Sequence, residues 1–235
     1  MPGYGLGGYG LGPYGGNASD NDLLKLMCYM LLEGENGTDA TGTTTLTTMF
    51  SISQFLAALN QRQERFLRDT AAVVTLVTLP TTPQIARYRL PDDWIHTRRL
   101  SWQANVATVL QPLHALARVD SFQLDHGFLD WQQNFADPTC YNDGSDLPTL
   151  TVELAKAPAN EGQMKLMYVA QPQTLANAPT ALGVPDEFSW PILFGALADC
   201  LVAEGDSHDP QRGAFCESMY DLGVEMTRAM LEGRA

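Results

Sequence analysis

The hydrophobic residues of this chain change their spacing twice, and that order limits the folds open to it. Toward both ends apolar residues recur every three or four positions, as on one face of an α-helix, whereas the middle is rich in β-branched residues and alternation. The periods predict helices at 20–33, 51–71, 186–204 and 210–232 and a β-rich insertion at about 73–170. This order favours an α+β fold, in which the N- and C-terminal helices form a bundle and an antiparallel β-rich subdomain is inserted between them.

Three of these helices have recognisable first turns. Ser51 and Gln54 have the spacing of a capping box, in which each side chain satisfies a free amide of the first turn. The stretch 185–187 places a proline and two acids where a helix N-terminus favours them. Asp209 before Pro210 predicts a cap followed by proline at the first helical position. These signals set the expected starts of the helices.

The last two helices each show an apolar stripe. In the first of them the predicted face consists of Trp190, Leu193, Leu197 and Leu201. In the second, apolar residues follow a 4-3-4-4 spacing, and we expect the early members to hold the helix against the bundle: Phe215, Met219 and Leu222. For its second half, which carries Met226 and Met230, we expect no later element as a cover.

Residues 1–18 form a Gly/Tyr-rich arm ahead of a single domain at 19–235. Glycine at nearly every second position raises the entropic cost of any fixed backbone, which favours disorder in isolation. Tyrosines recur every five residues, and they could become ordered against a partner: Tyr4, Tyr9 and Tyr14. The arm also matches G-x-G-x-x-G, but no strand precedes the match and no helix follows it, so no phosphate site is implied.

Charge and cysteine content exclude several classes of protein. The 235 residues carry 27 acidic and 14 basic side chains, a net charge of −13, which argues against a protein that binds nucleic-acid phosphates. No apolar run approaches the roughly 20 residues of a membrane-spanning helix, and we expect neither membrane association nor a secretion signal. The four cysteines are widely separated, which predicts free thiols in a reducing cytoplasm: Cys28, Cys140, Cys200 and Cys216.

The sequence contains no H-E-x-x-H, G-x-S-x-G, Walker A or EF-hand pattern. The four histidines have no metal-ligand spacing, and we expect no metal, no cofactor and no enzymatic activity: His96, His114, His126 and His208. Three acids recur every five residues near a short predicted helix, and paired carboxylates are the basis of glycosidase chemistry: Asp120, Asp125 and Asp130. A lytic or carbohydrate-active hydrolase therefore stays open as an alternative, although nothing else of an active site accompanies the three acids, which favours solvated or capping roles.

The densest basic group consists of Arg87, Arg89, Arg98 and Arg99. On neighbouring strands, alternate members would share a face of the sheet. There they would pair with nearby acids such as Asp92 or meet an acidic partner. We take the four arginines as candidates for a subunit interface.

The assembled motifs resemble the head-to-tail adaptor proteins of short-tailed bacteriophages, the family typified by tail tubular protein A. One group of motifs is Tyr88-x-Leu90-Pro91-Asp92-Asp93, Arg98-Arg99-x-x-Trp102, Leu124-Asp125 and Trp131. A second is Gly162-x-x-x-Leu166-x-Tyr168-Val169, Glu204-Gly205, Asp209-x-x-Arg212 and Glu217-x-x-Tyr220-x-x-Gly223. The resemblance covers roughly residues 20–232, and none of its motifs is catalytic.

The resemblance implies a structural virion protein. Members form homo-oligomeric rings, typically of twelve copies, that join the portal protein to the tail nozzle protein in the neck of the virion after assembly in the host cytoplasm. DNA would pass through the ring without specific binding, and an acidic lumen would favour that passage. A head-closure or tail-completion protein of a long-tailed phage is the second structural alternative.

The resemblance also suggests a role for the end of the last helix, because the C-terminal region of the family docks on the portal. Methionine beside arginine at a free helix end suits insertion into a groove on a neighbouring protein. We therefore assign portal contact to Met226, Met230, Leu231 and Arg234. The alternative is that these side chains complete the bundle.

Overall fold

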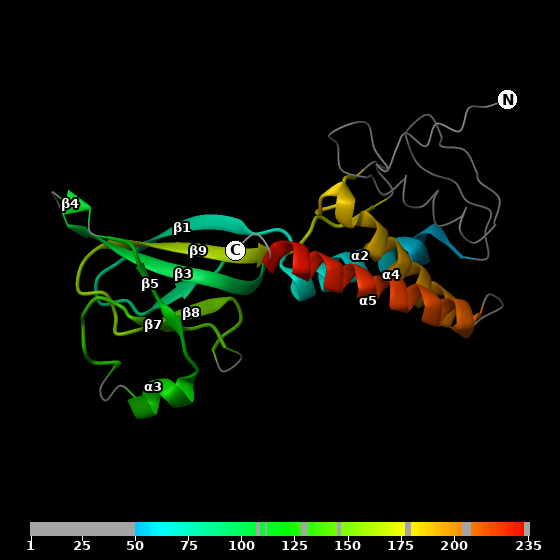
Figure 1. Ribbon diagram of the computed structural model, residues 1–235. Helices are drawn as coiled ribbons and strands as arrows, with labels where there is room; N and C mark the ends of the chain where they lie inside the picture. The colour runs from blue at the N-terminus through cyan, green and yellow to red at the C-terminus, as the bar shows by residue number, and fades with distance from the viewer. Residues whose placement is uncertain are drawn as a thin grey trace. The chain divides into compact units, whose positions relative to one another are not determined.

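The computed structural model describes residues 50–106, 109–110, 112–127, 131–144, 147–176, 180–203 and 208–232 (Figure 1). The Gly/Tyr arm with its three tyrosines and the helix expected at 20–33 lie outside the described residues. The chain divides into two compact units. Val74–Gln171 forms the β unit, and the segments on either side of it form the helical unit.

The helical unit contains α2 (Ile52–Thr70), a 3₁₀ turn η1 (Asp186–Phe188), α4 (Ser189–Val202) and α5 (Pro210–Glu232). The three α-helices contact one another, and Figure 1 shows them side by side. The capping box of α2 is confirmed: Ser51 Oγ accepts from the Gln54 amide, and the Ser51 amide donates to Gln54 Oε1 at 2.7 Å. The cap of α5 is confirmed as well, because Asp209 Oδ1 accepts from the Arg212 amide at 3.1 Å.

Helix α5 turns a different face to its neighbours from the one its apolar spacing predicts. Its buried residues are Gly213, Cys216, Tyr220, Gly223, Val224 and Thr227. Phe215 and Leu222 are 59% and 45% exposed, so the prediction that they hold the helix against the bundle is wrong. The reason is close packing: a Cβ at Gly223 would lie 2.4 Å from Pro191 Cγ of α4. Small residues bring the two helix backbones together, and the larger apolar side chains remain outside.

The β unit holds two sheets and one short helix, α3 (Ser121–Gly127). The larger sheet has the order β1-β9-β3-β4, with β5 also paired to β3, and its strands are β1 Thr75–Thr81, β3 Trp94–Val106, β4 Val109–Leu110, β5 His114–Ala115 and β9 Gly162–Ala170. The smaller sheet has the order β2-β8-β7-β6, with strands β2 Arg87–Arg89, β6 Ala117–Arg118, β7 Cys140–Asn142 and β8 Thr151–Ala155. Every named pairing is antiparallel except β6 with β7. The α+β class is therefore confirmed.

The core of the β unit is built on Trp102, which is 1% exposed. Its indole Nε1 donates to Thr81 Oγ1 of β1 at 3.2 Å, so the one polar atom of the ring is satisfied. Gly162 opposite it leaves room for the ring, since a Cβ there would lie 2.9 Å from the indole. Strand residues from both sheets complete this core, among them Leu100, Tyr141, Val152, Leu154, Met164 and Leu166.

Candidate functional site

The acids considered for hydrolysis serve local structure in the β unit. Asp120 Oδ1 accepts from the Gln123 amide at 2.7 Å and so caps α3. Asp125 Oδ1 accepts from the Trp131 indole at 3.1 Å, and Asp130 lies outside the described residues. Asp120 and Asp125 thus each have a structural partner within the described residues, and no hydrogen bond there joins one to the other.

In the part of the chain that the structure describes, no three His, Cys, Asp or Glu side chains lie close enough to hold a metal ion, and no helix there is long and apolar enough to cross a membrane. Three cysteines are buried free thiols: Cys140, Cys200 and Cys216. Burial raises the pKa of the Cys200 thiol to about 12, which makes it unreactive at neutral pH.

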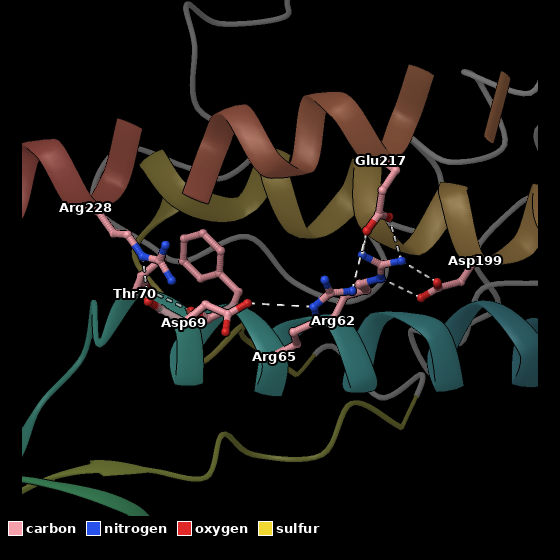
Figure 2. Close-up of polar contacts among 8 residues, drawn as sticks. Arg62, Arg65, Asp69, Thr70, Asp199, Glu217 and Arg228 are labelled. Atoms are coloured by element: carbon pink, nitrogen blue, oxygen red, sulfur yellow. Dashed lines mark hydrogen bonds and ion pairs between the residues drawn. The ribbon is translucent and has the colours of Figure 1, made fainter. Parts of the chain in front are cut away.

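The three helices meet at a buried arginine (Figure 2). Arg62 of α2 donates Nε to Asp199 Oδ2 of α4 at 2.7 Å and Nη1 to Glu217 Oε1 of α5 at 3.0 Å. Its side chain is 7% exposed, whereas those of Asp199 and Glu217 are 32% and 35% exposed. One guanidinium therefore joins three helices.

The electrostatics of this contact favour the charged arginine. Burial by itself would lower the pKa of Arg62, but the hydrogen bonds and ion pairs with Asp199 and Glu217 outweigh it and raise that pKa above its ordinary value. The guanidiniums of Arg62 and Arg65 also lie 4.9 and 5.3 Å from the centre of the Tyr220 ring, as cation–π pairs. Burial in turn raises the pKa of Tyr220 to about 12.

By its charge Arg62 would be expected to lie off the apolar stripe of α2, but the structure places it among the buried residues. Arg62 stands three residues after buried Leu59 and four before buried Phe66, which is core spacing. That spacing was the available signal. What the sequence could not reveal was the pair of acids that neutralises the charge, because they lie 137 and 155 residues away.

Helix α5 presents an apolar row along its outer side. We call it the α5 stripe: Phe215, Leu222, Met226 and Met230, which are 44–59% exposed. Phe215 also packs edge-on against Phe194 of α4, with ring centres 6.4 Å apart. Exposed acids border the stripe at Asp221 and Glu225, and neither makes an ion pair within the described residues. The stripe and its border have the composition of an interaction surface.

The residues assigned to portal contact are only partly visible in the structure. Met226 and Met230 are 44% and 53% exposed, Leu231 is half-buried, and Arg234 lies outside the described residues. The two methionines are therefore accessible for contact, as that assignment requires.

The sequence interpretation placed the four candidate arginines on neighbouring strands, whereas the structure places them on strands of different sheets. Arg87 and Arg89 belong to β2 of the smaller sheet, whereas Arg98 and Arg99 belong to β3 of the larger one. The first two are paired: Arg87 Nε lies 2.7 Å from Glu153 Oε1, and Arg89 Nη2 lies 2.5 Å from Asp92 Oδ1. The expected pairing with Asp92 is thus confirmed.

Arg98 and Arg99 are presented by a bulge. The register of β3 against β9 shifts between Thr97 and Arg99, so two consecutive side chains are exposed between buried Thr97 and buried Leu100. On β9, Met167 lies between Arg99 of β3 and Leu76 of β1 in the ladder, and it is 37% exposed. Leu76 is 63% exposed. We call these four residues the sheet patch: Leu76, Arg98, Arg99 and Met167.

Comparison with known proteins identifies the family. No curated protein matches the chain. The family model of the SU10 adaptor protein matches residues 34–234, which include both units and nearly the whole chain beyond the Gly/Tyr arm. With a match of this extent, the chain belongs to the SU10 adaptor protein family of bacteriophage head-to-tail adaptors.

Proposed function

We propose that this protein forms a ring in the neck of the virion, where it joins the portal to the tail nozzle and surrounds the DNA channel. Membership of the adaptor family supports a place among other virion components. The resemblance to adaptors of short-tailed phages supports a ring of twelve copies, assembled in the host cytoplasm. In this role the protein has no catalytic task.

The net charge of −13 fits a channel through which DNA slides. Phosphates are held by clustered Lys and Arg, and the release of counterions makes such contacts strong. A ring of acidic subunits repels the DNA backbone instead, so the genome passes without specific binding.

The observation that carries the proposal is the accessibility of the last turns of α5. Met226 and Met230 are 44% and 53% exposed although they lie on a helix whose other side is buried. Methionine is flexible and polarisable, which suits a groove on a partner of irregular shape. Together with Leu231 and Arg234, these side chains make up the proposed portal contact.

Removal of residues 229–235 tests this contact. We expect a soluble protein with unchanged melting temperature that no longer co-sediments with portal rings. A loss of several degrees would instead assign the segment to the core of the helical unit and overturn the docking role. The matched control is Phe122→Asp, which changes a side chain 68% exposed in the β unit and leaves portal binding intact.

The Gly/Tyr arm has a proposed role of its own, namely that Tyr4, Tyr9 and Tyr14 become ordered against a virion partner. The arm would then be cleaved by protease in the free protein and protected in the particle. Equal cleavage in both states would leave it as a tail without a binding role. An image of the virion neck with this chain located in it decides between a short-tailed adaptor and a head-closure protein of a long-tailed phage.

A further inference from the structure

Arg98 and Arg99 differ from every other arginine that the structure describes. Each of the others makes an ion pair or a hydrogen bond, including the exposed ones at Arg68, Arg89 and Arg118. Within the described residues Arg98 and Arg99 make neither, although the chain is rich in acids. Two adjacent unpaired guanidiniums on a protein of net charge −13 mark a surface at which an acidic group is missing.

Apolar side chains accompany these arginines. Arg99 lies directly across from Met167, and Met167 directly across from Leu76, so their Cβ atoms are about 5 Å apart in each pair. Leu76 and Met167 remain exposed on a sheet whose opposite face packs into the core. The sheet patch is thus an apolar row with a positively charged end.

The first half of the α5 stripe has the complementary composition. Phe215 and Leu222 are exposed, and Glu225 lies three residues after Leu222, which makes the two neighbours on the helix surface. Asp221 lies one turn before Glu225 and is exposed too. Here the row is apolar with a negatively charged border, and these acids also lack an ion-pair partner within the described residues.

We propose that the sheet patch of one copy binds the first half of the α5 stripe of a second copy, with Arg98 and Arg99 meeting Asp221 and Glu225. Both surfaces belong to the same chain, so a second copy supplies the partner of each. The contact is heterologous, and repetition of such a contact closes a ring when the rotation per copy allows it. This interface rests on the proposed ring and names the surfaces that would hold it together.

Charge reversal in the full-length protein tests the interface in the absence of any portal. Sedimentation velocity over a range of protein concentrations measures self-association of the wild type, of R98E/R99E and of D221K/E225K. We expect concentration-dependent association of the wild type and a loss of about tenfold or more in the association constant of either variant. All four positions are exposed, so both variants keep the wild-type melting temperature.

Mixing the two variants is the decisive experiment. In an equimolar mixture each acidic sheet patch meets a basic helix and each basic sheet patch meets an acidic helix, so association returns to the wild-type level. The control for R98E/R99E is R68E/R89E, which changes the net charge by the same amount at two arginines that already have acidic partners. We expect it to associate like the wild type.

Two outcomes would overturn the interface. One is a wild type whose sedimentation is independent of concentration up to its solubility limit. The other is a mixture that associates no better than its components. Either outcome leaves the portal contact at the end of α5 standing, because co-sedimentation with portal rings tests that contact separately.

Discussion

The two units of this protein bury charge in opposite ways. In the helical unit a buried cation, Arg62, is neutralised by two acids that are about one-third exposed. In the β unit two acids are buried instead, and each is paired with an exposed arginine: Glu153 with Arg87, and Asp143 with Arg118. The first arrangement joins three helices through one side chain, whereas the second joins residues that are close in the sheet.

These two arrangements predict how far the loss of one arginine should destabilise each unit. Loss of Arg62 removes a contact between α2, α4 and α5 at the same time. Loss of Arg118 leaves one carboxylate, whose side chain is 0% exposed, without its partner, but the surrounding β-ladder persists. We expect the loss of Arg62 to destabilise all three helices, and the loss of Arg118 to destabilise only the neighbouring strands of the β unit. The following experiments test that contrast.

Arg62→Met has the largest expected effect. It leaves Asp199 without the guanidinium it binds and Glu217 with only the longer ion pair to Arg65, at 3.5 Å. We expect it to lower the free energy of unfolding by about 3 kcal/mol, as for other buried ion pairs that lose one partner. Urea unfolding measures the loss, and amide hydrogen exchange should assign it to all three helices. Arg65→Met is the matched control, because its side chain is 49% exposed and its pairs should contribute under about 1 kcal/mol.

Arg118→Met should cost nearly as much, about 2–3 kcal/mol, because it leaves the Asp143 carboxylate, whose side chain is 0% exposed, as a buried charge without its partner. Faster exchange should be confined to the amides around β6 and β7. The double variant Arg118→Met/Asp143→Asn removes the uncompensated charge and should recover part of the loss. Faster exchange throughout the helices in Arg118→Met would contradict the contrast.

Gly223→Ala has the third-largest expected effect on stability, and whether it stabilises or destabilises is the informative result. At an exposed helical position this change stabilises by about 1 kcal/mol. Here the added methyl meets Pro191 and Trp190 of α4, so we expect a loss of about 1–2 kcal/mol in thermal unfolding. Gly213→Ala is the control: its methyl would meet only the half-exposed Val202 side chain within 3 Å, which can move, so the change should be close to neutral.

The smallest expected effect is a loss of folding stability that occurs only at alkaline pH. Burial raises the pKa of Tyr220 in the helical unit, and of Tyr141 and Tyr168 in the β unit, to about 12 from 10. A raised pKa means that folding favours the protonated phenol, so this contribution is fully present below pH 10 and is lost as pH rises toward 12. The helical unit also holds Cys200, whose thiol pKa burial raises to about 12 from 9, so its loss of stability should begin near pH 9, below that of the β unit. Far-UV circular dichroism recorded from about pH 9 to 12 should show the helical signal decreasing before the β signal. A simultaneous decrease of the two signals would argue against this order.

Features coded within a few residues were predictable from sequence, and those set by distant packing were not. The capping box at Ser51 and the cap at Asp209 depend on side chains within one turn of the helix, and both were confirmed. The buried face of α5 was misassigned because it depends on how closely Gly223 lets α4 approach. Apolar spacing located a stripe on this helix but could not say whether that stripe faces inward.

The candidate surfaces likewise combine a feature visible in the sequence with one that only distant pairing sets. The arginines at 87, 89, 98 and 99 were visible as a basic cluster, yet their assignment to two sheets depends on strand pairing over some 65 residues. The exposure of two consecutive arginines, Arg98 and Arg99, depends in turn on the bulge after Thr97. A one-residue shift of register is beyond what alternation in sequence can reveal.

The shared guanidinium of Arg62 also constrains how this family can vary. A change at any one of positions 62, 199 and 217 leaves unbalanced charge between the helices, whereas replacement of all three by apolar side chains of similar volume removes the charge altogether. Adaptor sequences should therefore keep or lose this triad together. Covariation of three positions so far apart in sequence would fix the alignment of α2, α4 and α5 in relatives whose overall similarity has become too weak to align them.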